Sequence, residues 1–145
     1  MTDSIQPIEP GRDIEALLSA SGLPTADLRD GAKVTLFACT RDSQLRGVVG
    51  LEMRGQVALL RSLAVPSPER GSGIGAALVS HAEQYAARQG VDTIYLLTTT
   101  AAEFFERRGY RHASRETAPA AIAGTSQFAG LCPSSSAFMA KPVGG

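Results

Sequence analysis

The sequence has no excess of charge of either sign, because 14 Lys and Arg residues balance 14 Asp and Glu residues over a length of 145. Proteins that bind a polyanion normally carry a basic excess, so this balance argues against a nucleic-acid partner. No apolar run is long enough to span a bilayer, and the first residues, MTDSIQPIEPGRD, lack the apolar core of a signal peptide. These absences predict a cytoplasmic protein without a membrane partner.

Cysteine is also scarce. The two cysteines, Cys39 and Cys132, are far apart in the sequence and match no metal-ligand spacing, so no metal site is expected. In a reducing compartment both are expected to be thiols, and Cys39 belongs in the core because its neighbours form an apolar strand pattern. Without an internal repeat, and with 43% hydrophobic residues, the chain is expected to form one globular domain over residues 1–145.

The sequence does contain a regular succession of strand and helix patterns. Asp13 is expected to cap the first helix, and three consecutive strands after it predict an antiparallel meander. The order predicts an α/β (α+β) fold with a mixed, partly antiparallel central sheet flanked by helices. Strand patterns cover residues 5–8, 33–40, 45–53, 57–65, 93–99, 110–114 and 136–143, and helix patterns cover residues 14–21, 26–31, 74–88, 101–109 and 118–130.

The segment ERGSGIGAAL, residues 69–78, places three glycines before the longest predicted helix. A dinucleotide site needs its first glycine at the end of a strand and an acidic residue at the end of the next strand. Here five residues, two of them prolines, separate Val65 from Gly71, and the next strand ends in threonines. A triphosphate-binding loop needs Gly-Lys-Ser or Gly-Lys-Thr, whereas this segment has Gly75-Ala76. A glycine-rich helix start without a ligand stays open as an alternative.

The run from Arg70 to Gly75 resembles the acetyl-CoA loop of the GNAT N-acetyltransferases, and TTTAAEFFERRGYR resembles a later block of the same family. Successive N–H groups at a helix N-terminus form an anion site that suits the pyrophosphate of CoA. The resemblance therefore implies acetyl-CoA as a co-substrate, bound without a metal. The cofactor-binding residues that it implies are Leu63, Ala64, Val65, Arg70, Gly71, Ser72, Gly73, Ile74, Gly75, Ala76, Thr98 and Phe104.

Two residues depart from the family pattern. Thr98 stands where the family often has an Asn that contacts the pantetheine arm, and its hydroxyl can still form a hydrogen bond there. Phe105 replaces the Tyr that often protonates the departing thiolate. A thiol with a pKa of about 8.5 is already a fair leaving group, so loss of the acid need not abolish catalysis.

Four stretches resemble the arsenic-resistance branch of the family: GLPTADL, GLEMRGQVALLRSLAV, YLLTTTAAEFF and FAGLCPSSSAFM. This resemblance implies acetylation of the α-amine of an amino-acid-like arsenical or phosphinic toxin, and hence detoxification. Such a small-molecule acceptor carries a carboxylate and an oxyanion. The fold that the resemblance implies often forms homodimers.

Several side chains are candidates for contact with the acceptor. Arg61 can clamp a carboxylate or an oxyanion through two parallel hydrogen bonds, although a solvated arginine fits the same pattern. Ser62, expected on the opposite face of the strand, can position a water, and Glu52 on the neighbouring strand is a candidate base. Cys132 is a candidate ligand of trivalent arsenic, although LCPSSS can also be a plain turn. Backbone N–H groups near Leu63–Val65 are expected to polarise the thioester, as the family mechanism implies.

The absence of an obvious base and the Phe105 substitution favour one alternative function. The chain can be a non-catalytic module of the same fold that binds CoA, or an arsenical through Cys132. His81, which recurs with apolar residues on one helix face, is expected to be a packed histidine and not part of the site.

Overall fold

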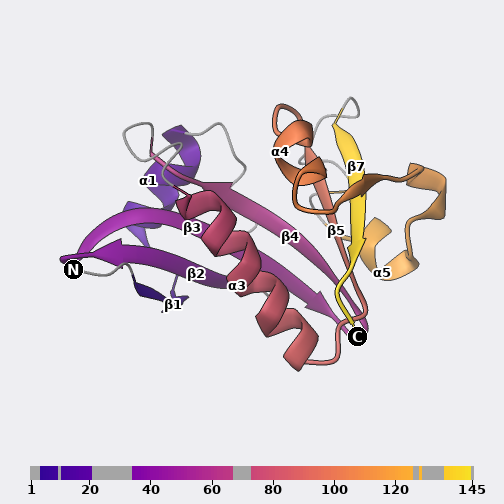
Figure 1. Cartoon of the computed structure of the whole chain (residues 1–145), viewed down its shortest axis with the longest axis horizontal. Helices are drawn as coiled ribbons and strands as arrows, with labels where there is room; N and C mark the ends of the chain where they lie inside the picture. The colour runs from indigo at the N-terminus through magenta and orange to yellow at the C-terminus, as the bar shows by residue number, and fades with distance from the viewer. Residues whose placement is uncertain are drawn as a thin grey trace.

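The computed structural model describes residues 4–9, 11–20, 34–66, 73–125, 128 and 136–144. Its centre is one seven-stranded sheet in the order β1-β2-β3-β4-β5-β7-β6 (Figure 1). Neighbouring strands are antiparallel except β4 and β5, which are parallel, so the predicted meander and mixed sheet are confirmed. The strands are β1 Ser4–Ile8, β2 Val34–Arg41, β3 Gln44–Arg54, β4 Val57–Ala64, β5 Thr93–Thr98, β6 Arg111–His112 and β7 Ala137–Pro142.

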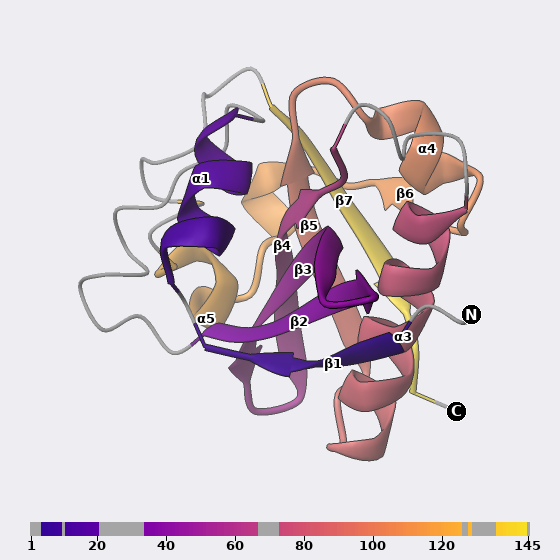
Figure 2. The ribbon, with the colours of Figure 1, turned by 90° about the vertical axis from the view of Figure 1, so that its left-hand side faces the viewer.

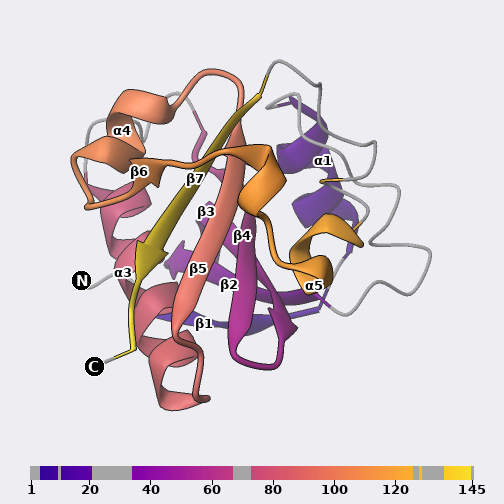
Figure 3. The same ribbon diagram turned by 90° about the vertical axis from the view of Figure 1, so that its right-hand side faces the viewer.

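Helices cover both faces of this sheet. The longest, α3 (Ile74–Arg88), lies on one face, and α1 (Arg12–Ala20) and α5 (Ala120–Ala123) lie on the other (Figure 2). The short helix α4 (Ala102–Glu106) lies beside the N-terminal end of α3, as Figures 2 and 3 both show. In the described part of the chain, no helix is both long enough and apolar enough to cross a membrane.

The helix α3 is placed by its apolar stripe. Ile74, Leu78, Val79, Ala82 and Ala86 recur at helical spacing, and all five are buried against the sheet. Its N-terminal half lies close to the backbone of β3, because a Cβ atom at Gly47 would stand 2.9 Å from Leu78 Cδ1 and 3.2 Å from the carbonyl oxygen of Ala64. The first turns of α3 are therefore held at a set height over β3 and β4.

The first helix begins two residues earlier than the sequence predicts. The N–H of Glu15 donates to the carbonyl of Gly11 at 2.9 Å, and α1 starts at Arg12. Asp13 therefore lies in the first turn, where its charge complements the helix dipole, instead of capping the helix. The turn expected at residues 26–31 lies outside the described residues.

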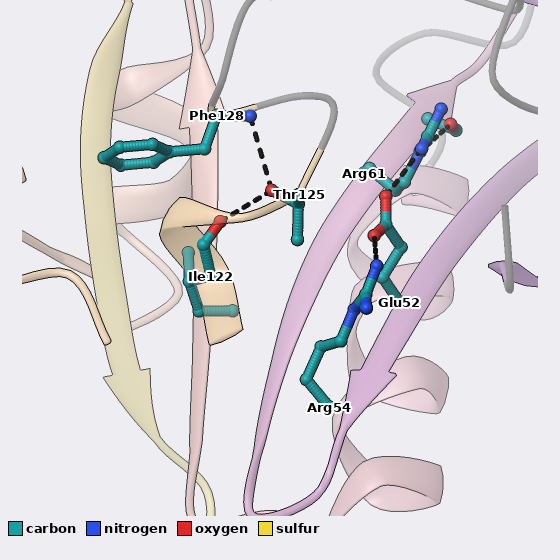
Figure 4. Close-up of polar contacts among 7 residues, drawn as sticks. Glu52, Arg54, Arg61, Ile122, Thr125 and Phe128 are labelled. Atoms are coloured by element: carbon teal, nitrogen blue, oxygen red, sulfur yellow. Dashed lines mark hydrogen bonds and ion pairs between the residues drawn. The ribbon is translucent and has the colours of Figure 1, made fainter. Parts of the chain in front are cut away.

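The long helix expected over residues 118–130 was a wrong prediction. The helix α5 covers Ala120–Ala123 and is interrupted at Gly124 and Thr125, and residues 126, 127, 129 and 130 lie outside the described residues. The hydroxyl of Thr125 donates to the carbonyl of Ile122 at 2.7 Å and accepts from the N–H of Phe128 at 3.3 Å (Figure 4). A hydroxyl that bonds to nearby backbone groups competes with the helix, which explains the early end. The strand expected at 110–114 is likewise shorter, since β6 covers Arg111–His112 and the N–H of Ala113 adds one further bond to the carbonyl of Phe138 at 2.8 Å.

Candidate active site

The candidate site begins where the parallel strands β4 and β5 separate. Their pairing joins Val57–Leu60 to Thr93–Leu96, although β4 continues to Ala64 and β5 to Thr98. Figure 1 shows the two ribbons diverging beyond their paired ends. The second half of β4 therefore pairs with β3 and not with β5. This half contains Leu63 and Ala64, two of the three residues expected at the thioester.

A β-bulge interrupts this half of β4. Gly50 of β3 pairs with Arg61 and Val48 pairs with Ala64, so Ser62 and Leu63 both stand opposite the single residue Val49. Ser62 has a φ of +58°, in the left-handed region that residues other than glycine rarely adopt. The bulge turns the backbone of β4 at the point where the strand leaves β5.

The bulge also corrects the predicted direction of one side chain. Strict alternation along β4 predicts Arg61 and Ser62 on opposite faces, but Arg61 Nε donates to Ser62 Oγ at 3.1 Å. The left-handed conformation at Ser62 removes the alternation on which that prediction depended. The two side chains therefore form one polar group.

Glu52 joins this group as a buried ion pair. Arg61 Nη1 donates to Glu52 Oε1 at 2.7 Å, and Arg54 Nη2 donates to Glu52 Oε2 at 3.0 Å (Figure 4). The side chains of Glu52 and Arg61 are each 1% exposed, whereas that of Arg54 is 41% exposed. Arg61 is thus not the solvated arginine of the alternative expectation, and Glu52 is buried together with it. Both carboxylate oxygens of Glu52 accept from a guanidinium.

The N-terminus of α3 supplies a group of backbone donors. The helix begins after Gly73, which has a φ of +87°, and no side chain caps it. The carbonyl of Gly73 accepts from the N–H of Ala77 at 3.0 Å, which is the first intrahelical bond. The preceding N–H groups, those of Ile74, Gly75 and Ala76, have no intrahelical acceptor, and such a helix end attracts an anion. Arg70, Gly71 and Ser72 lie outside the described residues.

Glycine is needed at position 75 for close packing and not for an unusual backbone conformation. A Cβ atom there would lie 3.4 Å from Phe104 Cζ and 3.9 Å from Val65 Cγ2. The structure thus brings together three predicted cofactor residues: Val65, which directly follows β4, Gly75 of α3 and Phe104 of α4. Open space surrounds the corresponding position at Gly73 instead, since no atom lies within 4 Å. The glycine requirement at Gly73 is therefore conformational.

Aromatic rings extend from this point into the core. The ring of Phe105, 5% exposed, contacts the rings of Phe104 and Tyr110 edge to face. Arg108 also lies over Phe104, with its Cζ 4.4 Å from the ring centroid. The Nε of Arg108 is buried and has no hydrogen-bond partner among the described residues. Arg108 therefore places a positive charge, with a donor available, next to the residues that pack on the start of α3.

Thr98 ends β5 at the edge of a polar depression. Its Oγ1 accepts from the N–H of Ala101 at 3.0 Å, which leaves its own O–H as a donor. The depression has a volume of about 430 Å³. Its lining residues are Thr98, Thr99, Thr100, Ala102, Glu103 and Ala137. Sequence reasoning missed Thr99, Thr100 and Glu103, although the run of three threonines after an apolar strand was the available signal.

His81 and Cys39 are packing residues in the structure. His81 lies two turns along α3 from Ile74 and packs edge to face on Phe37, and burial followed by the charge of Arg88 lowers its pKa. Cys39 is buried in β2, as predicted. Cys132 lies outside the described residues. Among the described residues, no three His, Cys, Asp or Glu side chains gather where they could hold a metal ion.

A second polar cluster connects α3 to β7 away from the diverging strands. Lys141 Nζ donates to Glu83 Oε1 at 3.0 Å and lies 5.7 Å from the ring centroid of Tyr110. Burial, followed by the charge of Glu83, raises the pKa of Tyr110 well above its usual value. The phenol of Tyr110 therefore stays protonated. The cluster joins α3 to β7 through Glu83 and Lys141.

Comparison with known proteins agrees with this arrangement. Residues 5–110 match the model of the acetyltransferase (GNAT) family. A segment of 67 residues is 39% identical to an uncharacterized N-acetyltransferase from Chlorobaculum tepidum and covers 46% of this chain and 43% of that relative.

Two solved structures share the fold. The N-acetylglutamate synthase from Neisseria gonorrhoeae, complexed with coenzyme A and N-acetyl-glutamate, superposes with a TM-score of 0.82 at 21% identity, over 99% of this chain and 35% of that one. The ribosomal-protein-S18-alanine N-acetyltransferase from Escherichia coli gives a TM-score of 0.72 at 18% identity, over 99% and 96% of the two chains. The chain thus spans less than half of its curated relative and of the gonococcal enzyme.

Proposed function

Since the chain belongs to the acetyltransferase (GNAT) family, we propose that it transfers the acetyl group of acetyl-CoA to the amine of a small molecule. The observation that carries this proposal is the N-terminus of α3. It opens without a side-chain cap at a left-handed glycine, and its first turn lies against Val65 and Phe104. A 15-residue helix that ends this way offers several N–H donors and a positive dipole end to the pyrophosphate of CoA.

The cofactor is proposed to lie from this helix end toward the diverging strands. Arg70, Gly71 and Ser72 precede the helix in sequence, so their N–H groups and the guanidinium are assigned to the phosphates together with those of residues 73–76. The pantetheine arm is assigned to the backbone of Leu63–Val65 and to the hydroxyl of Thr98, which keeps a donor for it. This arrangement directs the thioester toward the bulge in β4.

At the thioester, the neutral amine attacks the carbonyl carbon and the carbonyl oxygen takes up negative charge. Backbone N–H groups in the segment 63–65 are assigned to stabilise that oxygen. The carbon–sulfur bond then breaks, and CoA leaves as a thiolate, for which Phe105 can supply no proton. Because two guanidiniums already occupy both oxygens of Glu52, we assign the proton of the amine to water and not directly to Glu52.

The acceptor is proposed to be an amino-acid-like compound that carries an arsenic or phosphorus oxyanion. The stretches that resemble the arsenic-resistance branch support this class, as does the fold shared with an enzyme solved with N-acetyl-glutamate. The thiol of Cys132 is the proposed ligand for trivalent arsenic. The guanidinium of Arg61, which the sequence offers as a clamp for the acceptor anion, is 1% exposed and donates to Glu52 and Ser62 instead. The homodimer and the cytoplasmic location stay predictions.

The test is release of free thiol from acetyl-CoA against a panel of acceptors. The panel contains a phosphinic amino acid, an arsenic-containing amino acid, glutamate and a peptide with a free N-terminus. We expect turnover with the first two to exceed turnover with glutamate by about tenfold, which corresponds to about 1.4 kcal/mol of discrimination. Calorimetry with CoA is run in parallel. Binding of CoA without thiol release from any member of the panel would instead favour the non-catalytic module.

Arg108 provides a sharper test of the cofactor site. Replacing Arg108 with glutamine is expected to weaken CoA binding about tenfold, because a guanidinium donor to a phosphate is worth about 1.5–3 kcal/mol. Arg107→Gln is the matched control. Arg107 is exposed, and its substitution removes the same charge as the substitution of Arg108. Equal losses of CoA affinity in both variants would reduce the effect to net charge.

A further inference from the structure

A continuous chain of polar contacts connects the β3–β4 hairpin to the bulge in β4. Arg54 donates to Glu52 at 3.0 Å, Arg61 donates to the other oxygen of Glu52 at 2.7 Å, and Arg61 Nε donates to Ser62 Oγ at 3.1 Å. Figure 4 shows the side chains of Arg54, Glu52 and Arg61 following one another along β3 and β4. The chain starts at a part-exposed arginine and ends at the strained residue.

Stability alone does not account for an ion pair buried in this way. Removing two charges from water is costly, and a buried pair can often be replaced by apolar side chains without loss of stability. Glu52 and Arg61 are both almost fully buried, in a layer where the neighbouring side chains of α1, α5 and the sheet are apolar. A positioning role therefore explains the pair better than stability does, and its hydrogen bonds indicate which group is positioned.

The group at the end of the chain is the backbone of the bulge. A serine with a φ of +58° persists only where its surroundings impose that conformation. The hydrogen bond from Arg61 reaches the side chain of that serine, and Glu52 fixes the guanidinium that donates it. The direction of the following segment, Leu63–Val65, depends on the same conformation.

We propose that Glu52 and Arg61 are positioning residues that hold the bulge at Ser62, and thereby aim the backbone of Leu63–Val65 at the thioester. This inference rests on the proposed acetyl transfer for its catalytic consequence only. The structural part, that the buried pair imposes the conformation of Ser62 and Leu63, concerns the free protein. The two parts are therefore tested by separate measurements.

The experiment compares the wild type with Glu52→Gln and with the double variant Glu52→Leu/Arg61→Leu, which removes both charges together. In amide hydrogen exchange of the free protein, we expect the amides of Ser62 and Leu63 to exchange about tenfold faster in the double variant, which is about 1.4 kcal/mol of lost protection. Its melting temperature is expected to stay close to that of the wild type. Unchanged exchange at these two amides would overturn the inference, whether or not the protein is active.

Acetyl transfer then measures the catalytic consequence. With the acceptor identified, kcat is expected to fall at least about tenfold in both variants while the Kd for CoA stays within about twofold. The double variant removes the charge imbalance of Glu52→Gln, so a low kcat in a stable protein separates positioning from folding. A double variant with wild-type kcat would overturn the positioning role. A raised KM for the acceptor at unchanged kcat would overturn it too, in favour of direct acceptor binding by Arg61.

The matched control is an ion pair on another part of the sheet. Glu83 and Lys141 are joined at 3.0 Å, and Glu83→Leu/Lys141→Leu removes a pair of the same charge between α3 and β7. This control is expected to leave the amides of Ser62 and Leu63 and the kcat unchanged. A control that loosened those amides as much as the test variant would overturn the assignment to Glu52 and Arg61.

Discussion

Replacing Gly73 with valine is expected to lower the affinity for CoA about 100-fold, or by about 2.8 kcal/mol. Gly73 has a φ of +87° at the residue before α3, and a β-branched side chain is a strong outlier in that region. The substituted residue would change its backbone conformation, and the N–H groups of Ile74 and Gly75 would no longer face the same point. Each charge-assisted hydrogen bond lost in this way is worth about 1.5–3 kcal/mol.

Two controls isolate the geometry of the helix end. Gly73→Asn is expected to keep most of the affinity, because asparagine tolerates the left-handed region. Gly90→Val places the same strain at the other end of α3, where φ is +91° and open space surrounds the substituted atom, as it does at Gly73. Calorimetric titration with CoA measures all three variants. Equal loss of affinity in Gly73→Val and Gly90→Val would show that the substitution acts through the stability of α3 and not through the site.

Replacing Gly47 with valine is expected to lower the free energy of unfolding by about 3 kcal/mol, at the upper end of what overpacking usually costs. A Cβ atom at Gly47 would stand 2.9 Å from Leu78 Cδ1 and 3.2 Å from both Ile74 Cγ2 and the carbonyl oxygen of Ala64. Leu78 can rotate away, but the backbone oxygen of Ala64 cannot without moving β4. The strain therefore falls on the contact between α3 and the bulged half of β4.

Urea denaturation gives the size of this effect, with Gly11→Ala as the control. Gly11 has no atom within 4 Å of the corresponding position, so its substitution is expected to change the unfolding free energy by less than about 0.5 kcal/mol. Gly47→Val with wild-type stability would mean that α3 moves outward at little cost. The height of α3 over the sheet would then not be set by packing at Gly47.

Local patterns predicted a large part of this fold because they depend on residues close in sequence. The apolar spacing in residues 74–88 predicts α3, and the strand patterns with short turns between them predict the meander of β2, β3 and β4. The glycines before α3 predicted a backbone anion site, and the structure finds the helix end without a side-chain cap. Where a local competitor acts, the same reasoning failed, as at Thr125, whose hydroxyl ends α5 early.

The sequence by itself determined that this chain builds a mixed sheet with a glycine-led helix beside it, and that its two sequence blocks match those of an acetyltransferase family. The sheet and the helix follow from periodicity and turn spacing, whereas the family follows from the resemblance of the two blocks. Only the tertiary structure decided that Glu52 and Arg61 form a buried pair, that Ser62 turns toward Arg61, and that Phe104 packs on Gly75. Each of these depends on register between separate strands or on contact between separate helices. One extra residue in β4 reverses the direction of the side chains that follow it, and a hydrophobic pattern along the sequence does not reveal such a bulge.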